Sequence, residues 1–180
     1  STTEPIGTPL PTTPAASRGV CLGVIVGNRD FFPDSLIAGA RARIAALFSE
    51  LGITPVIVDD QATKLGGVET YEDARRCADL FRTQVHRIDG VLIALPNFGD
   101  ERAIVDTLRE SGLNVPLLVQ AEPDDLDGLD VARRRDSFCG KISVCNNLRQ
   151  YGYPFSLTRQ HAVSLADPEF REDLEWFVTV

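Results

Sequence analysis

An arginine follows the first strongly apolar run of the chain, and two aromatic residues come shortly after it. The run ends at Gly27, Asn28 and Arg29 come next, and Phe31 and Phe32 follow. A guanidinium group is a planar fork of hydrogen-bond donors that suits hydroxyl-rich or anionic ligands, and neighbouring rings can hold it in place. The same neighbours can also form a purely structural cation–π contact. Both interpretations of Arg29 stay open at this point.

Further polar and aromatic side chains follow later apolar runs. Asp59 and Asp60 end the second run, Asn97 and Phe98 follow the third, and Gln120 lies near the end of the fourth. If these runs are parallel strands, their carboxyl ends share one edge of a sheet, where ligands of such folds usually bind. The candidate ligand-binding residues, expected around one shallow cleft with Phe31 and Phe32, are Arg29, Asn28, Phe98, Asn97 and Gln120.

Other residues that could do chemistry give weaker predictions. Neither glycine-rich phosphate loop follows the first run, so nucleotide binding is not predicted. Asp59 and Asp60 could hold a metal or accept a phosphoryl group, but capping or solvated carboxylates are the favoured interpretation. The two histidines, His86 and His161, are interpreted as surface groups, and the acidic loop 122–130 as solvated. No catalytic residue or metal ligand is assigned in this chain.

Composition restricts the classes of partner. The 180 residues carry a net charge of −8 and have a pI of about 4.7, which argues against nucleic acid and anionic membranes. No apolar run approaches the roughly 20 residues of a membrane span, and the N-terminus lacks a secretory pattern. We therefore expect a cytoplasmic protein, with no membrane partner. Its cysteines, Cys21, Cys77, Cys139 and Cys145, are expected to be reduced and mostly buried.

The elements that position these residues begin after an N-terminal arm. Residues 1–18 are rich in Thr and Pro and poor in apolar groups, which predicts a flexible arm. Residues 19–180 then alternate between strand-like and helix-like patterns with short connections. The predicted strands are 19–27, 53–60, 90–96, 114–121 and 154–158, and the predicted helices begin at Asp34, Thr70, Asp100, Asp136 or Ser137, and Asp167.

This alternation predicts a single α/β domain over residues 19–180. The expected architecture is a Rossmann-like or flavodoxin-like parallel sheet of about five strands with helices on both faces. Its last helix closes on Trp176 and Phe177. An exposed aromatic pair at this place would be an apolar patch, so we expect self-association through it.

Five segments carry long and specific sequence patterns. They are VGNRDFFPDSL, KLGGVETYEDARRCADLF, DGVLIALPNFGDE, NVPLLVQAEPDD and RRRDSFCGKISVCNNLRQYGYPFSLT. Together they resemble the N-terminal domain of the L-fucose isomerase-like proteins, which are related to the L-fucose and L-arabinose isomerases. The resemblance extends from about residue 20 to the end of the sequence and leaves out the arm.

The resemblance implies the first domain of a larger homo-oligomeric enzyme of carbohydrate metabolism that interconverts aldoses and ketoses. Manganese and the acid–base carboxylates would lie in later domains, so Mn²⁺ is expected in the full-length enzyme and no cofactor within this chain. The first domain would act as a lid over a neighbouring subunit's active site. There Arg29 and Phe98 would contact a small sugar or sugar-like ligand.

Two alternatives of other classes remain. A free-standing sugar-binding or protein-interaction module without catalysis would use the same strand-end residues. A small complete enzyme would instead use Asp59 and Asp60. The apolar end of the last helix, which looks separated from a partner, argues against both alternatives.

Overall fold

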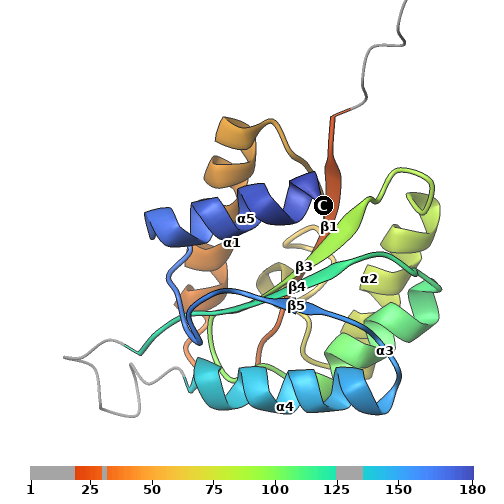
Figure 1. The fold of residues 1–180 in the computed structure, drawn as a ribbon. Helices are drawn as coiled ribbons and strands as arrows, with labels where there is room; N and C mark the ends of the chain where they lie inside the picture. The colour runs from red at the N-terminus through yellow and green to blue at the C-terminus, as the bar shows by residue number, and fades with distance from the viewer. Residues whose placement is uncertain (1–18, 30–31, 125–135) are drawn as a thin grey trace, which may run out of the picture.

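A five-stranded parallel sheet forms the centre of the molecule (Figure 1). The computed structural model describes residues 19–29, 32–124 and 136–180. The strands lie in the order β2-β1-β3-β4-β5. They are β1 (Cys21–Val26), β2 (Thr54–Ile57), β3 (Gly90–Leu95), β4 (Leu117–Ala121) and β5 (Ser156–Leu157). This sheet confirms the predicted α/β class.

The three central strands explain the continuous apolar runs of the sequence. Every residue of β1, β3 and β4 is buried, because helices cover both faces of the sheet. The two outer strands, β2 and β5, are shorter and have exposed residues. The apolar runs therefore mark the middle of the sheet, whereas its edges give weaker sequence patterns.

In the described part of the chain, five α-helices form the two outer layers (Figure 1). The helices α1 (Ser35–Leu51) and α5 (Pro168–Thr179) pack on one face, where their apolar side chains share a core with β1. On the other face lie α2 (Tyr71–Thr83), α3 (Glu101–Ser111) and α4 (Ser137–Gln150). A short 3₁₀ helix, η1 (Lys64–Gly66), precedes α2.

The helix ends follow the sequence signals at most places. The helix predicted to begin at Thr70 starts with a capping box formed by Thr70 and Asp73, and Gly52 ends α1 in the left-handed conformation with φ 69°. Asp34 takes the N-cap position of α1, as the predicted helix start requires, but its side chain makes no capping hydrogen bond. Its carboxylate instead pairs with Lys64 Nζ at 3.2 Å, which ties the start of α1 to η1.

The end of α5 corrects one prediction about the aromatic pair. Trp176 is 55% exposed, as expected, but Phe177 is only 7% exposed and belongs to the core on the α1–α5 face. A Cβ added at Gly90 would lie 3.1 Å from the Phe177 ring, so the ring packs directly on β3. The apolar surface of this helix therefore centres on Trp176 alone.

Some predictions fall on residues that the structure does not describe. The arm 1–18, Phe31 and the greater part of the acidic loop 122–130 lie outside the described residues. Within the described ranges, no helix is long and apolar enough to cross a membrane.

The cysteines divide into three buried thiols and one exposed thiol. Cys21, Cys77 and Cys145 are buried, as predicted for most of the thiols, whereas Cys139 is exposed. Burial, together with the nearby Asp73 carboxylate, raises the pKa of the Cys77 thiol to about 12. The reactive thiolate of Cys77 is therefore scarce in the folded protein.

We expect one thiol of the native protein to react rapidly with an aromatic disulfide reagent at mildly alkaline pH, and the other three only after unfolding. Cys139 is the fast thiol because it alone of the four is exposed. Absorbance of the released thiolate, with and without denaturant, measures both classes. Cys139→Ser should remove the fast phase, and a fast phase that persists in this variant would contradict the assignment.

Candidate functional site

Arg29, which follows the carboxyl end of β1, lies against Phe98 of the segment that joins β3 to α3 and against Glu101, the first residue of α3. Its guanidinium carbon is 4.2 Å from the centre of the Phe98 ring. Its Nη2 donates to Glu101 Oε2 at 3.1 Å, and the side chains of Arg29 and Glu101 remain 35% and 27% exposed. The structure thus brings Arg29 and Phe98 together at one edge of the sheet and adds Glu101 to them.

Behind this group, two fully buried asparagines join the ends of β1 and β3. Asn97 Nδ2 donates to Asn28 Oδ1 at 2.6 Å. Asn97 Oδ1 accepts from the backbone N–H groups of Arg29 at 3.2 Å and Gly99 at 3.0 Å. Asn28 Nδ2 donates in turn to Glu69 Oε2 at 3.0 Å. A buried amide left without partners would cost about 1–3 kcal/mol, so this connected set of bonds fixes the backbone that carries Arg29.

The segment before α2 returns to the end of β1 and completes the support. Val68 forms an isolated parallel β-bridge with Gly27. The N–H of Val68 donates to Val26 O at 2.8 Å, and its carbonyl accepts from Asn28 N at 3.1 Å. A Cβ at Gly27 would lie 2.9 Å from Leu95 Cδ2, closer than real Cβ atoms approach. Glycine therefore allows the close packing of β1 against β3 directly before Asn28.

Gln120 lies inside the protein at the end of β4. It is fully buried, and its Nε2 donates to the carbonyl of Val163 at 2.8 Å. Like Asn28 and Asn97, it thus holds the end of a strand from inside the domain. A direct contact between a ligand and any of these three amides stays a prediction.

Residues 23–180 match the family model described as the N-terminal domain of fucose/sulfoquinovose isomerase. The chain belongs to this family. The match confirms the resemblance found in the sequence, and it includes Arg29, Asn97, Phe98 and Glu101. A search of the curated proteins found no match.

The remaining sequence candidates in this isomerase N-terminal domain do not join Arg29 and Phe98 in a ligand site. Asp59 and Asp60 are exposed, and Asp59 Oδ1 accepts from the backbone N–H of Gln61 at 2.8 Å, which agrees with the interpretation as a turn-capping group. His86 and His161 are exposed, as predicted for surface groups. Phe32 is buried and belongs to the interior rather than to a cleft.

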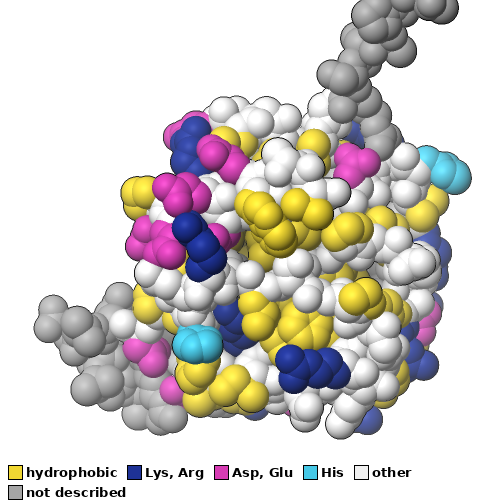
Figure 2. All heavy atoms as spheres, viewed as in Figure 1, with side chains coloured by type: hydrophobic (Ala, Val, Ile, Leu, Met, Phe, Trp, Pro, Cys, Tyr) yellow, Lys and Arg dark blue, Asp and Glu magenta, His cyan; other side chains and the backbone are white. Residues whose placement is uncertain are grey.

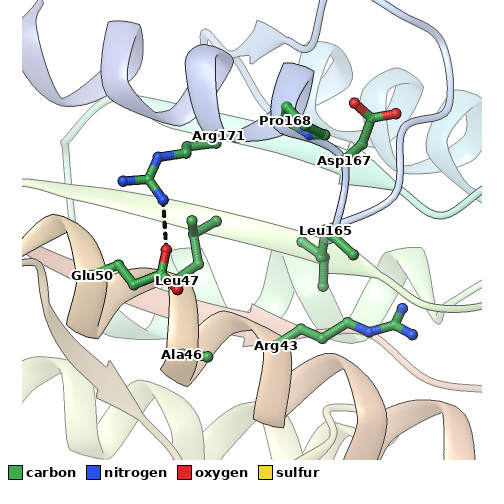
Figure 3. Close-up of a pocket in the computed structure, with 9 residues that line it drawn as sticks. Arg43, Ala46, Leu47, Glu50, Leu165, Asp167, Pro168 and Arg171 are labelled. Carbon is green, nitrogen blue, oxygen red and sulfur yellow. Dashed lines mark hydrogen bonds and ion pairs between the residues drawn. The ribbon is translucent and has the colours of Figure 1, made fainter.

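A separate hollow of about 340 Å³ lies between α1 and α5 of the domain (Figure 3). Arg171 of α5 reaches across it, and its Nη1 donates to Glu50 Oε2 of α1 at 2.5 Å. Leu47 and Leu165 form its apolar floor. Because Arg171 and Glu50 pair across the hollow, we interpret it as part of the packing interface between α1 and α5.

Sequence reasoning missed two carboxylates of the site. Glu101 pairs with Arg29, and Glu69 accepts from Asn28. The position of Glu101 offered a signal, because it follows the Asn97–Phe98 turn and opens the next helix, which must start at the same edge of the sheet. Glu69 offered none, since the return of its segment to β1 is a long-range contact.

Gly140, in the DSFCGKIS segment that opens α4, lies directly against the backbone of Phe98. A Cβ added at Gly140 would lie 1.9 Å from the carbonyl oxygen of Phe98 and 2.7 Å from its Cα. Glycine therefore lets α4 pack directly on the backbone that carries the Phe98 ring. Any side chain at this position must displace either the helix or the site.

We expect Gly140→Ala to lower the free energy of unfolding, although alanine is the better helix former. Overpacking costs about 1–3 kcal/mol, which is more than the roughly 1 kcal/mol that alanine gains over glycine in a helix. Urea denaturation measures the change.

Gly39→Ala in α1 is the matched control, because nothing lies within 4 Å of its added Cβ. This variant should gain stability, by up to about 1 kcal/mol. Equal gains in both variants would show that α4 does not pack tightly on Phe98.

Proposed function

We propose that this domain is the substrate lid and assembly domain of an aldose–ketose isomerase. In this role Arg29 and Phe98 contact a sugar in the active site of a neighbouring subunit. Membership of the fucose/sulfoquinovose isomerase N-terminal domain family supports the reaction class. The observation that carries the sugar contact is the partly exposed guanidinium of Arg29 on the face of the Phe98 ring.

A sugar has two kinds of surface that this pair can recognise. The guanidinium fork donates to hydroxyl or acidic oxygens, and an aromatic face covers the C–H surface of the sugar ring. The bond from Arg29 Nη2 to Glu101 uses one of the five N–H donors of the guanidinium. Phe98 and Glu101 hold the fork before the ligand arrives, which lowers the ordering cost of binding.

The metal-dependent chemistry of such an isomerase does not fit the described residues. No group of three or more His, Cys, Asp or Glu side chains in the described ranges is placed to hold a metal ion. In our proposal, manganese and the acid–base groups belong to other domains of the enzyme.

We expect the purified 180-residue chain to show no aldose–ketose interconversion, even with added Mn²⁺. The reason is that the described residues lack a ligand cluster for the metal. Incorporation of deuterium from ²H₂O into a carbon–hydrogen position of an aldose, detected by NMR, is a sensitive measurement of this reaction. Turnover by rigorously pure protein would contradict the proposal that catalysis needs further domains.

In the enzyme that joins this domain to its catalytic domains, we expect Arg29→Lys to lower kcat/KM. Lysine keeps the charge but loses the planar fork, so a charge-assisted contact of about 1.5–3 kcal/mol should be lost. Steady-state kinetics and the bound-metal content should be measured on the same preparation. The metal content should stay at the wild-type level, because the metal lies in another domain.

Arg109→Lys is the matched control for this substitution. Its guanidinium carbon lies 4.8 Å from the centre of the Tyr151 ring, near the other end of α3. This variant loses a similar stacking contact, of about 0.5–1 kcal/mol, without touching the candidate site. If Arg29→Lys behaves in the same way, with lower stability and unchanged kinetics, then Arg29 is a structural residue and the proposed sugar contact is wrong.

A further inference from the structure

The outer edge of β5 is surrounded by exposed apolar side chains. One side of β5 pairs with β4, and no described strand pairs with its other side. Phe138, Ile142 and Leu157 are 43%, 56% and 46% exposed around this edge. Figure 2 shows hydrophobic side chains gathered along this face, over α5 and between β5 and α4. Such a concentration on a sheet edge indicates a contact surface.

A hollow of about 210 Å³ lies within this surface, between α4 and β5. We call it the α4/β5 groove, lined by Phe138, Lys141, Ile142, Arg149, Leu157 and His161. Its volume is on the scale at which an apolar cavity accepts an aromatic ring. The groove is therefore suited to one large side chain of a partner.

The charges of the α4/β5 groove are positive. No Asp or Glu is among the described residues that line it. Arg149 supplies an exposed guanidinium, whereas Lys141 is only 4% exposed and lies beneath the surface. Lys141 Nζ is held in place by hydrogen bonds to Thr158 Oγ1 at 3.1 Å and His161 O at 2.8 Å. The groove thus fits an aromatic side chain that is accompanied by carboxylates.

The outer surface of α5 has this chemistry. Trp176 is 55% exposed, and the side chains of Glu172 and Glu175 are 66% and 52% exposed beside it. Two arginines, Arg159 and Arg171, pair with these glutamates. The carboxylates of this helix outnumber the two arginines, so the surface around Trp176 stays acidic.

The positions of the two surfaces favour a contact between two copies. α5 belongs to the layer on one face of the sheet and α4 to the layer on the other, with β5 between them at the near edge (Figure 1). A two-fold axis along β5 would place α5 of each copy over α4 of the other. An axis across β5 would instead place acidic α5 against acidic α5, which is unfavourable.

We propose that two copies of this chain pair across their β5 edges, with Trp176 of each copy in the α4/β5 groove of the other. The same surface is used on both copies, so the contact closes on itself and stops at two. The pairing rests on the assembly part of the proposed function and defines its surface. It does not depend on Arg29, which lies at the carboxyl edge of the sheet.

Trp176 is the single tryptophan of the chain, so its fluorescence reports on the contact directly. We expect light scattering over a dilution series to show the mass of two chains at high concentration and of one chain at low concentration. The Trp176 emission should shift to shorter wavelength, and become less accessible to a collisional quencher, over the same concentrations. The two transitions should coincide, because they report one event.

Ile142→Glu should remove both transitions, since it places a carboxylate in the groove opposite the acidic face of α5. Val85→Glu is the matched control, because Val85 is also an exposed apolar residue, at 40%, and lies beyond the end of α2. Both positions are exposed, so circular dichroism should show both variants folded. Trp176→Ala should give the mass of one chain at every concentration.

Three results would overturn the proposed pairing, and they differ in whether the assembly role of the domain is also contradicted. Dimers whose Trp176 emission does not change would show assembly through another surface, so the assembly role would stand. A single-chain mass at all concentrations with an exposed Trp176 would contradict the assembly role as well. A single-chain mass with a permanently buried Trp176 would show that the chain covers its own tryptophan.

Discussion

The hydrogen bonds of Asn97 hold together the two strand ends from which the candidate site is built. Its amide joins Asn28 of the β1 end to Gly99 of the β3 end, and it also fixes the backbone N–H of Arg29. Both asparagines are fully buried, so a lost partner could not be replaced by water without opening the sheet edge. The exposed cation–aromatic pair depends on this buried polar contact for its position.

The domain keeps its two proposed activities on different edges of the sheet. The carboxyl edge carries Arg29 and Phe98 over a rigid polar support, whereas the lateral edge at β5 carries apolar groups. Parallel sheets lend themselves to this division, because strand ends and outer strands are separate surfaces. A lid domain needs both surfaces, one to meet the ligand and one to be held in a fixed place.

The sequence predicts the parts of this fold that depend on local patterns. Buried strands appear as unbroken apolar runs, and the capping box at Thr70 needs only four neighbouring residues. The side-chain direction at a strand end is not a local property, because an amide such as Gln120 turns inward only when a distant carbonyl, here that of Val163, accepts its proton. The burial of Phe177 beside exposed Trp176 also depends on a distant residue, because Gly90 leaves room on β3 for the Phe177 ring.

Because Gly140 has no side chain, the backbone of α4 packs directly on the loop that carries Phe98, and the two are expected to move together. No side chain of Gly140 lies between the helix and the carbonyl of Phe98, so a displacement of α4 must also displace the loop. The outer surface of that helix contributes Ile142 and Arg149 to the α4/β5 groove. A copy bound in this groove would also restrain the Phe98 ring that we propose as the sugar contact. By thermodynamic reciprocity, ligand affinity and pairing strength would then be linked quantities, each changing the other by the same factor.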